Sequence, residues 1–323
     1  KITYKLINFL KPTLNVKYIS IVNNATIGLI IAQRAIGFTG DIITTPFSFS
    51  ATAHSIKWNG LNPIFVDTDK YAGNLDPGKV QESITKNTGG ILAVHNYGMP
   101  GNVEKLSEIA DQYNIPLIYD AAPAIGVNYK GNSIFNYGDL SVMSFHGTKI
   151  FTTFEGGAIV SPSEKMKQKV DLIKNFAIIS QDEVNGLGIN GKMNEAEAAL
   201  GIIQLKYIDS IIEKRKTIYN YYDKKIKNID GIDMIKIPYN TSYNYSYVPV
   251  IFSNGIVNRD MMYIKMKENN IFCRKYWHPL ITENNIYKNS VTGDLKNAKK
   301  LSESILCLPI YPSLNQTDID RVI

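Results

Sequence analysis

Two side chains of complementary chemistry stand behind apolar segments of this 323-residue chain. Asp120 ends the apolar segment 118–120, and Lys149 follows 29 residues later, just past a second apolar segment at 140–144. A lysine amine forms a Schiff base with a carbonyl, and a carboxylate can keep a pyridine nitrogen protonated. Pyridoxal phosphate (PLP) enzymes need both groups, so the pair predicts a PLP site. Either residue alone is more simply explained, as a surface lysine or as a helix-capping aspartate.

Other residues along the chain suit the rest of such a cofactor. Segment 23–26 joins an expected strand to an expected helix, where free backbone N–H groups and the helix dipole can hold a phosphate. The alternative is plain N-capping by Asn24 or Thr26. Phe49 can stack on an aromatic ring or pack in the core, and Ser144 can bind phosphate or simply end a strand. The order of these residues along the chain (phosphate loop, aromatic, acid, serine, lysine) favours the cofactor site.

The first half of the chain alternates short apolar runs with helical stretches. The runs predict strands at 18–22, 42–45, 63–66, 90–94, 116–119 and 140–144. Strands this apolar, separated by helices such as 103–112, are buried on both faces and indicate a mainly parallel α/β sheet flanked by helices. Ligands of such sheets bind outside the carboxyl ends of the strands. Asp120 and Ser144 lie at two of those ends.

The pattern changes after residue 188. Two long helices are expected, at 193–208 and 211–227, and shorter elements follow them. The strands among these are expected at 245–252, 271–274 and 305–308, and the helices at 259–267 and 295–303. We therefore expect a PLP-binding large domain, 1–204, and a smaller C-terminal α+β domain, 205–323.

Composition narrows the classes of function. The formal net charge is +6 and the pI is near 9.0, but basic residues mostly alternate with acidic and apolar ones, and no basic and aromatic platform for nucleic acid is visible. No apolar run approaches the roughly 18 residues of a membrane span. The four histidines are scattered, and Cys273 and Cys307 form no CxxC pair, which argues against a metal site. With no export signal in the sequence, we expect a cytoplasmic protein.

Several segments together resemble one family of enzymes, the PLP-dependent sugar aminotransferases of fold type I that are named for DegT, DnrJ, EryC and StrS. The segments that carry the resemblance are 24–26 (NAT), 45–49 (TPFSF), 63–67 (PIFVD), 94–98 (VHNYG), 119–122 (YDAA), 144–157, 188–193 (GINGKM) and 306–309 (LCLP). They span nearly the whole chain in the family's order, which makes the match more specific than any single motif.

The resemblance implies a role for each matching residue of the cofactor site. Lys149 would form the Schiff base, Asp120 would pair with the pyridine nitrogen, and Phe49 would stack on the ring. The family's phosphate site is matched by Ala25, Thr26 and Ser144.

Further matches concern the partner subunit and the substrate. Asn190 matches an asparagine that reaches the phosphate of the neighbouring subunit, which implies a homodimer with shared active sites. His146, Tyr276 and His278 fall where the family lines the sugar pocket.

The chain departs from the family's pattern at two positions. After Asp120 and the two alanines the family usually carries Gln or His, which contacts the ring hydroxyl of the cofactor. Here the residue is Pro123, which offers no side-chain hydrogen bond and has no backbone N–H. This puts the contact in doubt but not the cofactor. The second departure is Ala25, which stands where glycine is common.

The resemblance implies transfer of an amino group from L-glutamate to a keto-sugar nucleotide. Segments 43–49, 58–61 and 144–149 are most similar to the branch that aminates C4 of dTDP-4-keto-6-deoxyglucose for surface polysaccharide, such as O-antigen. An alternative within the family is C3 amination of a dTDP-3-keto-6-deoxyhexose. A related sugar dehydratase carries histidine in place of the lysine, so Lys149 argues against it. A non-enzymatic regulator that binds PLP or a sugar nucleotide is the alternative of another class, although no helix-turn-helix segment or basic tail is visible.

Overall fold

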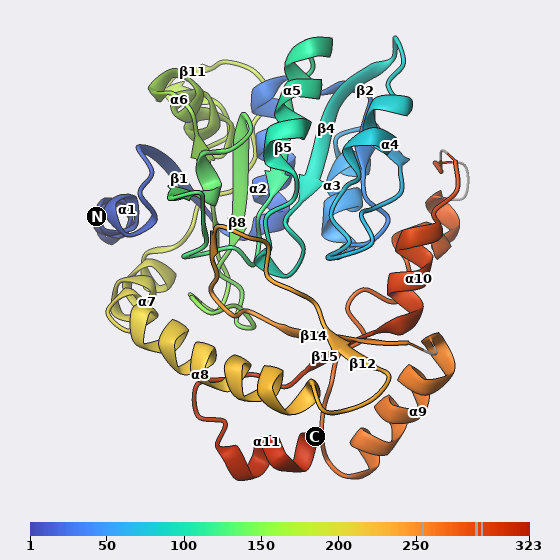
Figure 1. Cartoon of the computed structure of the whole chain (residues 1–323). Coiled ribbons are helices and arrows are strands. Elements are labelled where there is room, and N and C mark those ends of the chain that lie inside the picture. Colours follow the sequence, from blue (N-terminus) through green and yellow to red (C-terminus); the bar gives the residue numbers. More distant parts are fainter. Residues whose placement is uncertain (254, 288–289, 292) are drawn as a thin grey trace.

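A seven-stranded sheet organises the first half of the chain. The computed structural model describes residues 1–253, 255–287, 290–291 and 293–323. In sheet order the strands are β1 (Tyr18–Val22), β9 (Gly157–Ser161), β8 (Leu140–Ser144), β5 (Leu117–Asp120), β4 (Thr88–Val94), β2 (Thr39–Thr44) and β3 (Asn62–Phe65). The odd strand is β9, which is antiparallel to both β1 and β8, whereas the remaining pairs are parallel. The predicted mainly parallel sheet is confirmed (Figure 1).

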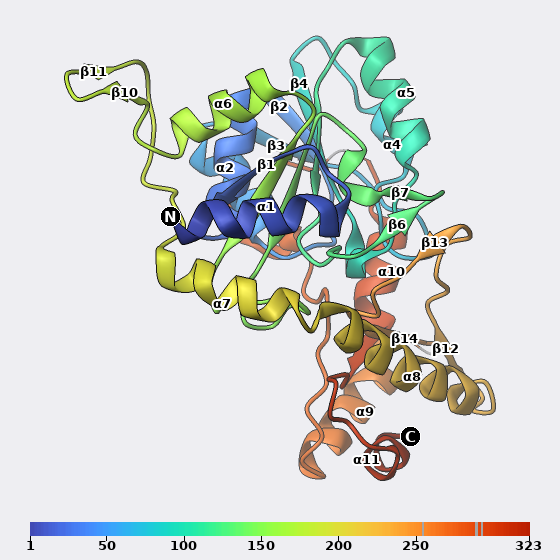
Figure 2. The ribbon, with the colours of Figure 1, turned by 90° about the vertical axis from the view of Figure 1, so that its left-hand side faces the viewer.

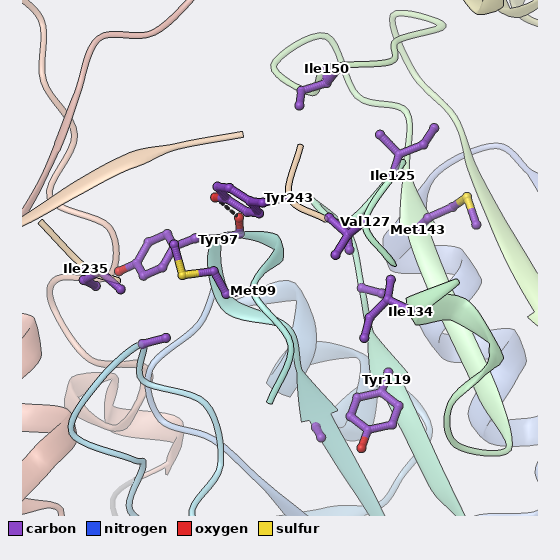
Figure 3. Packing of buried hydrophobic residues seen from close by; sticks show 14 of the residues in the cluster. Tyr97, Met99, Tyr119, Ile125, Val127, Ile134, Met143, Ile150, Ile235 and Tyr243 are labelled. Carbon is purple, nitrogen blue, oxygen red and sulfur yellow. Dashed lines mark hydrogen bonds between the residues drawn. The ribbon is translucent and has the colours of Figure 1, made fainter. Parts of the chain in front are cut away.

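Helices cover both faces of this sheet (Figures 1 and 2). On one face lie α2 (Ala25–Ile36), α3 (Ala51–Trp58) and α6 (Glu164–Ile173). On the other face lie α1 (Ile2–Leu14) and α5 (Val103–Tyr113), with α4 (Pro77–Glu82) beside α5. Residues of a strand point alternately to the two faces. In β5, Ile118 therefore packs with the α2 face, and Tyr119 packs in the larger core on the α5 face (Figure 3).

A second region follows α7 (Glu195–Leu205), which packs against α1. Its antiparallel sheet has the order β12 (Ile232–Met234), β14 (Val248–Phe252) and β15 (Ile305–Leu308). Around it lie α8 (Ile208–Ile226), α9 (Gly255–Glu268), α10 (Lys296–Ser304) and α11 (Gln316–Val322). This agrees with the expected α+β region. The strand predicted at 271–274 is wrong, because only a single bridge between Arg274 and Cys307 forms there.

The two regions are joined by pairing as well as by the chain. The short strand β13 (Thr241–Ser242) comes from the second region, and it extends the hairpin of β6 (Asn128–Tyr129) and β7 (Asn132–Ser133) from the first. The residues after β13 therefore enter the second region directly from this small three-stranded sheet. This connection brings the segment 243–247 next to the carboxyl ends of the sheet strands.

A hairpin of β10 (Ile178–Ser180) and β11 (Glu183–Val184) projects away from the body of the molecule (Figure 2). Several large apolar side chains on and after it are exposed, namely Ile178, Ile179, Val184 and Leu187. Large apolar side chains gathered on one exposed element are typical of a surface that another molecule covers.

Candidate active site

A cavity of about 250 Å³ opens at the carboxyl ends of β1, β4, β5 and β8. The alternation of the strands explains which side chains reach it. Ile118 and Val142 pack on the α2 face, so Asp120 and Ser144, each two residues further on, point to the same face. Both line the cavity, as expected of residues at the strand ends of a parallel sheet.

Asp120 is a buried carboxylate held by two donors. Thr52 Oγ1 donates to Asp120 Oδ2 at 2.8 Å, and the Ala122 N–H donates to Oδ1 at 3.2 Å. Burial raises the pKa of Asp120, while these two hydrogen bonds and the charge of Lys149 act in the opposite direction. A carboxylate in this state is stabilised further by a cationic partner in the cavity, because the partner replaces the hydration that burial removes.

Lys149 lies in a turn at the cavity wall. Its backbone N–H donates to His146 O at 2.9 Å, and the half-buried side chain points into the cavity, where Nζ faces Tyr247 Oη at 3.5 Å. Lys149 itself belongs to the loop after β8, and its amine lies close to Tyr247 in the segment before β14.

The start of α2 offers backbone donors to the same cavity. Asn24 caps the helix, because its Oδ1 accepts from the Ile27 N–H at 2.9 Å. The N–H groups of Ala25 and Thr26 are among the first of the helix, so they have no acceptor within it. A Cβ on Gly157 would lie 2.9 Å from Ala25 N, so glycine lets β9 pass directly behind this loop. The capping by Asn24 is thus observed, the N–H groups of Ala25 and Thr26 remain available for the predicted phosphate, and Ser144 lines the same cavity.

Aromatic side chains form the wall opposite the sheet. The exposed ring of Phe49 has its centroid 5.9 Å from that of Trp277, and Trp277 packs on Tyr276 at 4.5 Å. Trp277 Nε1 donates to Asn96 Oδ1 at 3.1 Å, which fixes the indole against the end of β4. Phe49 and Tyr276 thus line the cavity, and their roles in ring stacking and in the sugar pocket stay predictions.

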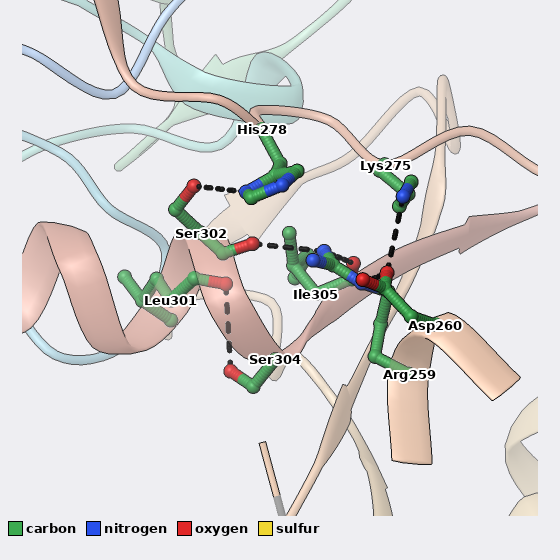
Figure 4. Close-up of polar contacts among 8 residues, drawn as sticks. All are labelled: Arg259, Asp260, Lys275, His278, Leu301, Ser302, Ser304 and Ile305. Carbon is green, nitrogen blue, oxygen red and sulfur yellow. Dashed lines mark hydrogen bonds and ion pairs between the residues drawn. The ribbon is translucent and has the colours of Figure 1, made fainter. Parts of the chain in front are cut away.

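The two histidines predicted for the sugar pocket lie in different surroundings. His146 lines the cavity mouth, with Nδ1 2.9 Å from Thr148 Oγ1 and Nε2 3.6 Å from Glu155 Oε1. His278 is not brought to the cavity wall. Its Nδ1 lies 3.1 Å from Ser302 Oγ, in a polar cluster beside α10 (Figure 4). Burial lowers the pKa of His278.

Asn190 lies away from the cavity of its own chain. It is exposed, it forms a single bridge with Asn175, and the next residue, Gly191, accepts a hydrogen bond from the Asn23 N–H at 2.9 Å. Asn190 therefore lies at the surface, next to the residues that precede α2. It does not line the cavity.

Three contacts to the predicted site residues come from residues that were not predicted from the sequence, and of these residues only Trp277 and Tyr247 line the cavity. Thr52, Trp277 and Tyr247 contact the predicted site residues from other elements of the chain. Thr52 lies three residues after Phe49, in the first turn of α3, so the helical spacing of the two residues is a signal that could have found it. Nothing in the local sequence around Trp277 or Tyr247 indicates their partners.

The set of groups in the cavity fits PLP. A buried carboxylate suits a pyridinium, a lysine amine suits an aldehyde, and helix N–H groups with a serine hydroxyl suit a phosphate. Asp120, Lys149 and the loop 24–26 line one continuous cavity whose size matches a small cofactor with room at its mouth. Within the described residues, no group of three or more His, Cys, Asp or Glu side chains could hold a metal ion, and no helix is long and apolar enough to cross a membrane.

The chain is similar to known proteins in both sequence and fold. The chain is 42% identical over 325 aligned residues to dTDP-4-amino-4,6-dideoxy-D-glucose transaminase of Shigella dysenteriae, an alignment that covers 100% of this chain and 88% of the relative. The fold is similar to that of DesI, solved in the presence of its TDP-sugar product, with a TM-score of 0.94 and 29% identity over 99% of this chain and 82% of DesI. It is also similar to NtdA from Bacillus subtilis with bound cofactor PMP, with a TM-score of 0.91 and 25% identity over 100% of this chain and 75% of NtdA.

A family model matches nearly the whole chain as well. The match runs from residue 7 to residue 323, so it includes both the cavity and the second region. The resemblance seen in the sequence is thereby confirmed, and the chain is an enzyme of the DegT/DnrJ/EryC1/StrS aminotransferase family.

Proposed function

We propose that this aminotransferase uses PLP to move an amino group from L-glutamate to C4 of dTDP-4-keto-6-deoxyglucose. The observation that carries the cofactor and the reaction is the pair of Asp120 and Lys149 in one cavity, at the ends of β5 and β8. The substrate rests on similarity, since the relative from Shigella dysenteriae is named for the 4-amino sugar and DesI was solved with a TDP-sugar.

Different residues of the cavity would bind different parts of the cofactor. Asp120 would hold the pyridine nitrogen, the loop at Ala25 and Thr26 with Ser144 would hold the phosphate, and Phe49 would cover the ring. When bound, PLP supplies an aldehyde that takes up the amino group and a protonated ring that accepts electrons. The buried setting of Asp120 suits this role, because a carboxylate kept from water interacts more strongly with a cationic nitrogen.

Lys149 would bind the cofactor and then carry the proton. Once the amino donor displaces it, its amine is a base tethered within reach of the reacting carbons. The turn at His146 keeps the lysine backbone fixed while the side chain moves, because the N–H of Lys149 remains bonded to His146 O at 2.9 Å.

The sugar nucleotide would enter through the mouth of the cavity. His146 and Tyr276 lie there and can donate to sugar hydroxyls, and His278 could approach only by leaving Ser302. Which ring carbon is aminated depends on how these groups orient the sugar, and a few hydrogen bonds are enough to change it. Amination of C3 of a dTDP-3-keto-6-deoxyhexose is therefore the second candidate.

We infer that the active unit is a homodimer. The projecting hairpin exposes Ile179, Val184 and Leu187, apolar surface that a second subunit would cover. Asn190 follows this hairpin and does not line its own cavity, which suits a residue that completes the phosphate site of the partner subunit. The product would serve the synthesis of surface polysaccharide such as O-antigen, from enzyme in the cytoplasm.

The purified protein allows a direct test. Added PLP should give a yellow protein, and L-glutamate without sugar should bleach it, because the amino group moves to the cofactor in the first half-reaction. Sugar nucleotides of the 4-keto and 3-keto series, with dTDP and UDP, should then be compared by turnover. Faster turnover of a 3-keto or UDP sugar would contradict the proposed substrate. Binding of PLP without bleaching by any amino acid would indicate a regulator.

A further inference from the structure

The order of the strands decides which side of the cavity meets which side of the cofactor. Around the pyridine ring of PLP, the phosphate arm lies on one side of the line from the nitrogen to the aldehyde carbon, and the hydroxyl lies on the other. Ser144 on β8 and the loop after β1 lie to one side of Asp120 on β5. If these groups hold the phosphate, the ring hydroxyl faces the other side, towards β4 and the residues that follow it.

Two residues on that side cannot serve the hydroxyl. Pro123 lines the cavity but has no hydrogen-bonding side chain and no N–H. His95 follows β4 and its Nε2 finds no hydrogen-bond partner among the described residues. Its ring, however, stacks on Tyr119 at 4.3 Å, and Tyr119 leaves β5 on the face opposite to Asp120. His95 is among the residues that line the cavity, but its imidazole stacks on the face of Tyr119 and accepts from the Gly101 N–H, on the side of the sheet opposite to Asp120.

Tyr247 is brought to this side by hydrogen bonds to Pro123 itself. Asn244 Nδ2 and Ser246 Oγ both donate to Pro123 O, at 2.8 and 2.9 Å. Arg215 donates to the carbonyls of Tyr245 and Ser246 at 3.3 and 3.2 Å, so the segment is held from both directions.

The ring of Tyr247 is positioned as firmly as its backbone. It packs edge-on against Tyr97 at 5.7 Å and against Tyr276 at 6.0 Å. Tyr97 is fixed in turn, because its carbonyl accepts a 2.6 Å hydrogen bond from Tyr243 Oη (Figure 3). The hydroxyl of Tyr247 ends 3.5 Å from Lys149 Nζ. That nitrogen would bond to the aldehyde carbon of PLP, which is attached to the ring position next to the one that carries the hydroxyl.

We propose that Tyr247 donates a hydrogen bond to the ring hydroxyl of the cofactor and so replaces the side-chain contact that Pro123 cannot make. This inference rests on the proposed PLP chemistry of the site. A donor at this oxygen stabilises its anionic form, which makes the neighbouring nitrogen of Lys149 less basic. The spectrum of the bound cofactor reports that basicity, so the contact can be measured without turnover.

The experiment compares Tyr247→Phe with Tyr245→Phe in the full-length protein. Phenylalanine keeps the packing of the ring at both positions, and Tyr245 packs on Tyr219 and Tyr243 outside the cavity. We expect Tyr247→Phe to bind PLP about tenfold more weakly and to move the pH of the cofactor's absorbance change up by about one unit. Tyr245→Phe should change neither, and thermal unfolding should be similar for both.

Other ionisable groups near Tyr247 do not contribute to the pH dependence of the cofactor's absorbance near neutral pH. Those that face it besides Lys149 are Tyr97, Tyr243, Tyr276 and Arg215. Burial raises the pKa of each of these three tyrosines, so none of them titrates near neutral pH, and the arginine stays cationic.

A second variant tests the link to Pro123. The double variant Pro123→Gln/Tyr247→Phe supplies an amide donor where the hydroxyl was lost, while the carbonyl of residue 123 keeps its two acceptor bonds. We expect at least half of the pH shift and of the lost affinity to return. No shift in Tyr247→Phe, or a shift that glutamine at 123 leaves unchanged, would overturn the inference. A wild-type protein that binds no PLP would instead overturn the proposed function.

Discussion

Thr52 Oγ1 donates a 2.8 Å hydrogen bond to Asp120 Oδ2, which joins the helix α3 to the end of β5. The hydroxyl is itself buried and lies 2.8 Å from Ser48 Oγ. A neutral donor that stabilises a buried carboxylate keeps it ionised, and an ionised Asp120 is what a pyridine nitrogen needs in order to stay protonated. Under the proposed function, Thr52 would act on the cofactor through Asp120, as a positioning residue.

Removing this hydroxyl should impair the chemistry more than the fold. Thr52→Val keeps the shape of the side chain but leaves Asp120 Oδ2 without its donor. A hydrogen bond to a charged group contributes about 1.5–3 kcal/mol, so we expect kcat in the glutamate half-reaction to fall by about tenfold or more. Thr52→Ser should restore most of the rate, because it returns the hydroxyl. Equal rates for the valine and serine variants would show that the contact is not used.

Replacing the lysine should abolish the reaction. Lys149→Ala removes the amine proposed to bind the cofactor and to act as the base, so kcat should fall by several orders of magnitude. The side chain is half-buried and faces a cavity, so the melting temperature should change little. Lys165→Ala, which removes an exposed lysine at the start of α6, is the matched control and should be fully active. Turnover near wild type in Lys149→Ala would contradict the whole assignment of the site.

The sequence predicted the strands that are buried on both faces. β1, β8 and β15 have the predicted bounds, since an apolar run bounded by polar residues marks where a buried strand begins and ends. β9 was missed, although Gly157–Ser161 is apolar. Its antiparallel place between β1 and β8 depends on pairing across the chain, which local pattern does not encode. The hairpin of β10 and β11 was also missed, because its side chains are exposed and show no pattern of burial.

Some residues of the site could also be predicted from the local sequence, and others could not. Asp120, Ser144 and Lys149 follow strand ends, so their common location follows from the parallel sheet alone. Thr52 and Tyr247 reach them from α3 and from the second region, and only the folded chain brings those elements together. The predictions for His278 and Asn190 came from resemblance, and neither residue lines the cavity.

The buried His95 should make the protein sensitive to acid. Burial lowers the pKa of His95 to about 3, whereas an exposed histidine has a pKa near 6.5. In the unfolded chain the imidazole takes up a proton below pH of about 6.5, and in the folded chain it does not. Above that pH, His95 does not lower the free energy of unfolding. As the pH drops from about 6.5 towards 3, the free energy of unfolding falls by about 1.4 kcal/mol per pH unit.

Denaturation at several pH values measures this effect. His95→Phe keeps the stacking on Tyr119 but loses the acceptor for the Gly101 N–H, which lies 3.3 Å from His95 Nδ1. The variant should be less stable at pH 7.5, by about 1 kcal/mol, yet lose less stability than wild type between pH 6.5 and 5. Parallel pH profiles for the two proteins would show that His95 is protonated in the folded state.

The shared active site can be tested by mixing two inactive proteins. Lys149→Ala lacks the reactive amine, and Asn190→Ala should lack the donor to its partner's phosphate, so each homodimer should be crippled. In a mixed dimer, one site combines both defects and the other has neither. With equal amounts and full exchange of subunits, half of the dimers are mixed, so activity should return to about a quarter of the wild-type value.

The control for this experiment comes from the same segment, which follows the hairpin of β10 and β11. Asn185→Ala changes another exposed asparagine, whose backbone N–H donates to Ala177 O. On its own it should be active, and mixing it with Lys149→Ala should give only the activity it contributes by itself. Exchange of subunits has to be verified by a mass tag on one partner. If verified mixed dimers of Lys149→Ala and Asn190→Ala stay inactive, Asn190 serves the cavity of its own chain. That result would also require the segment 188–193 to move, because Asn190 does not line that cavity in the structure.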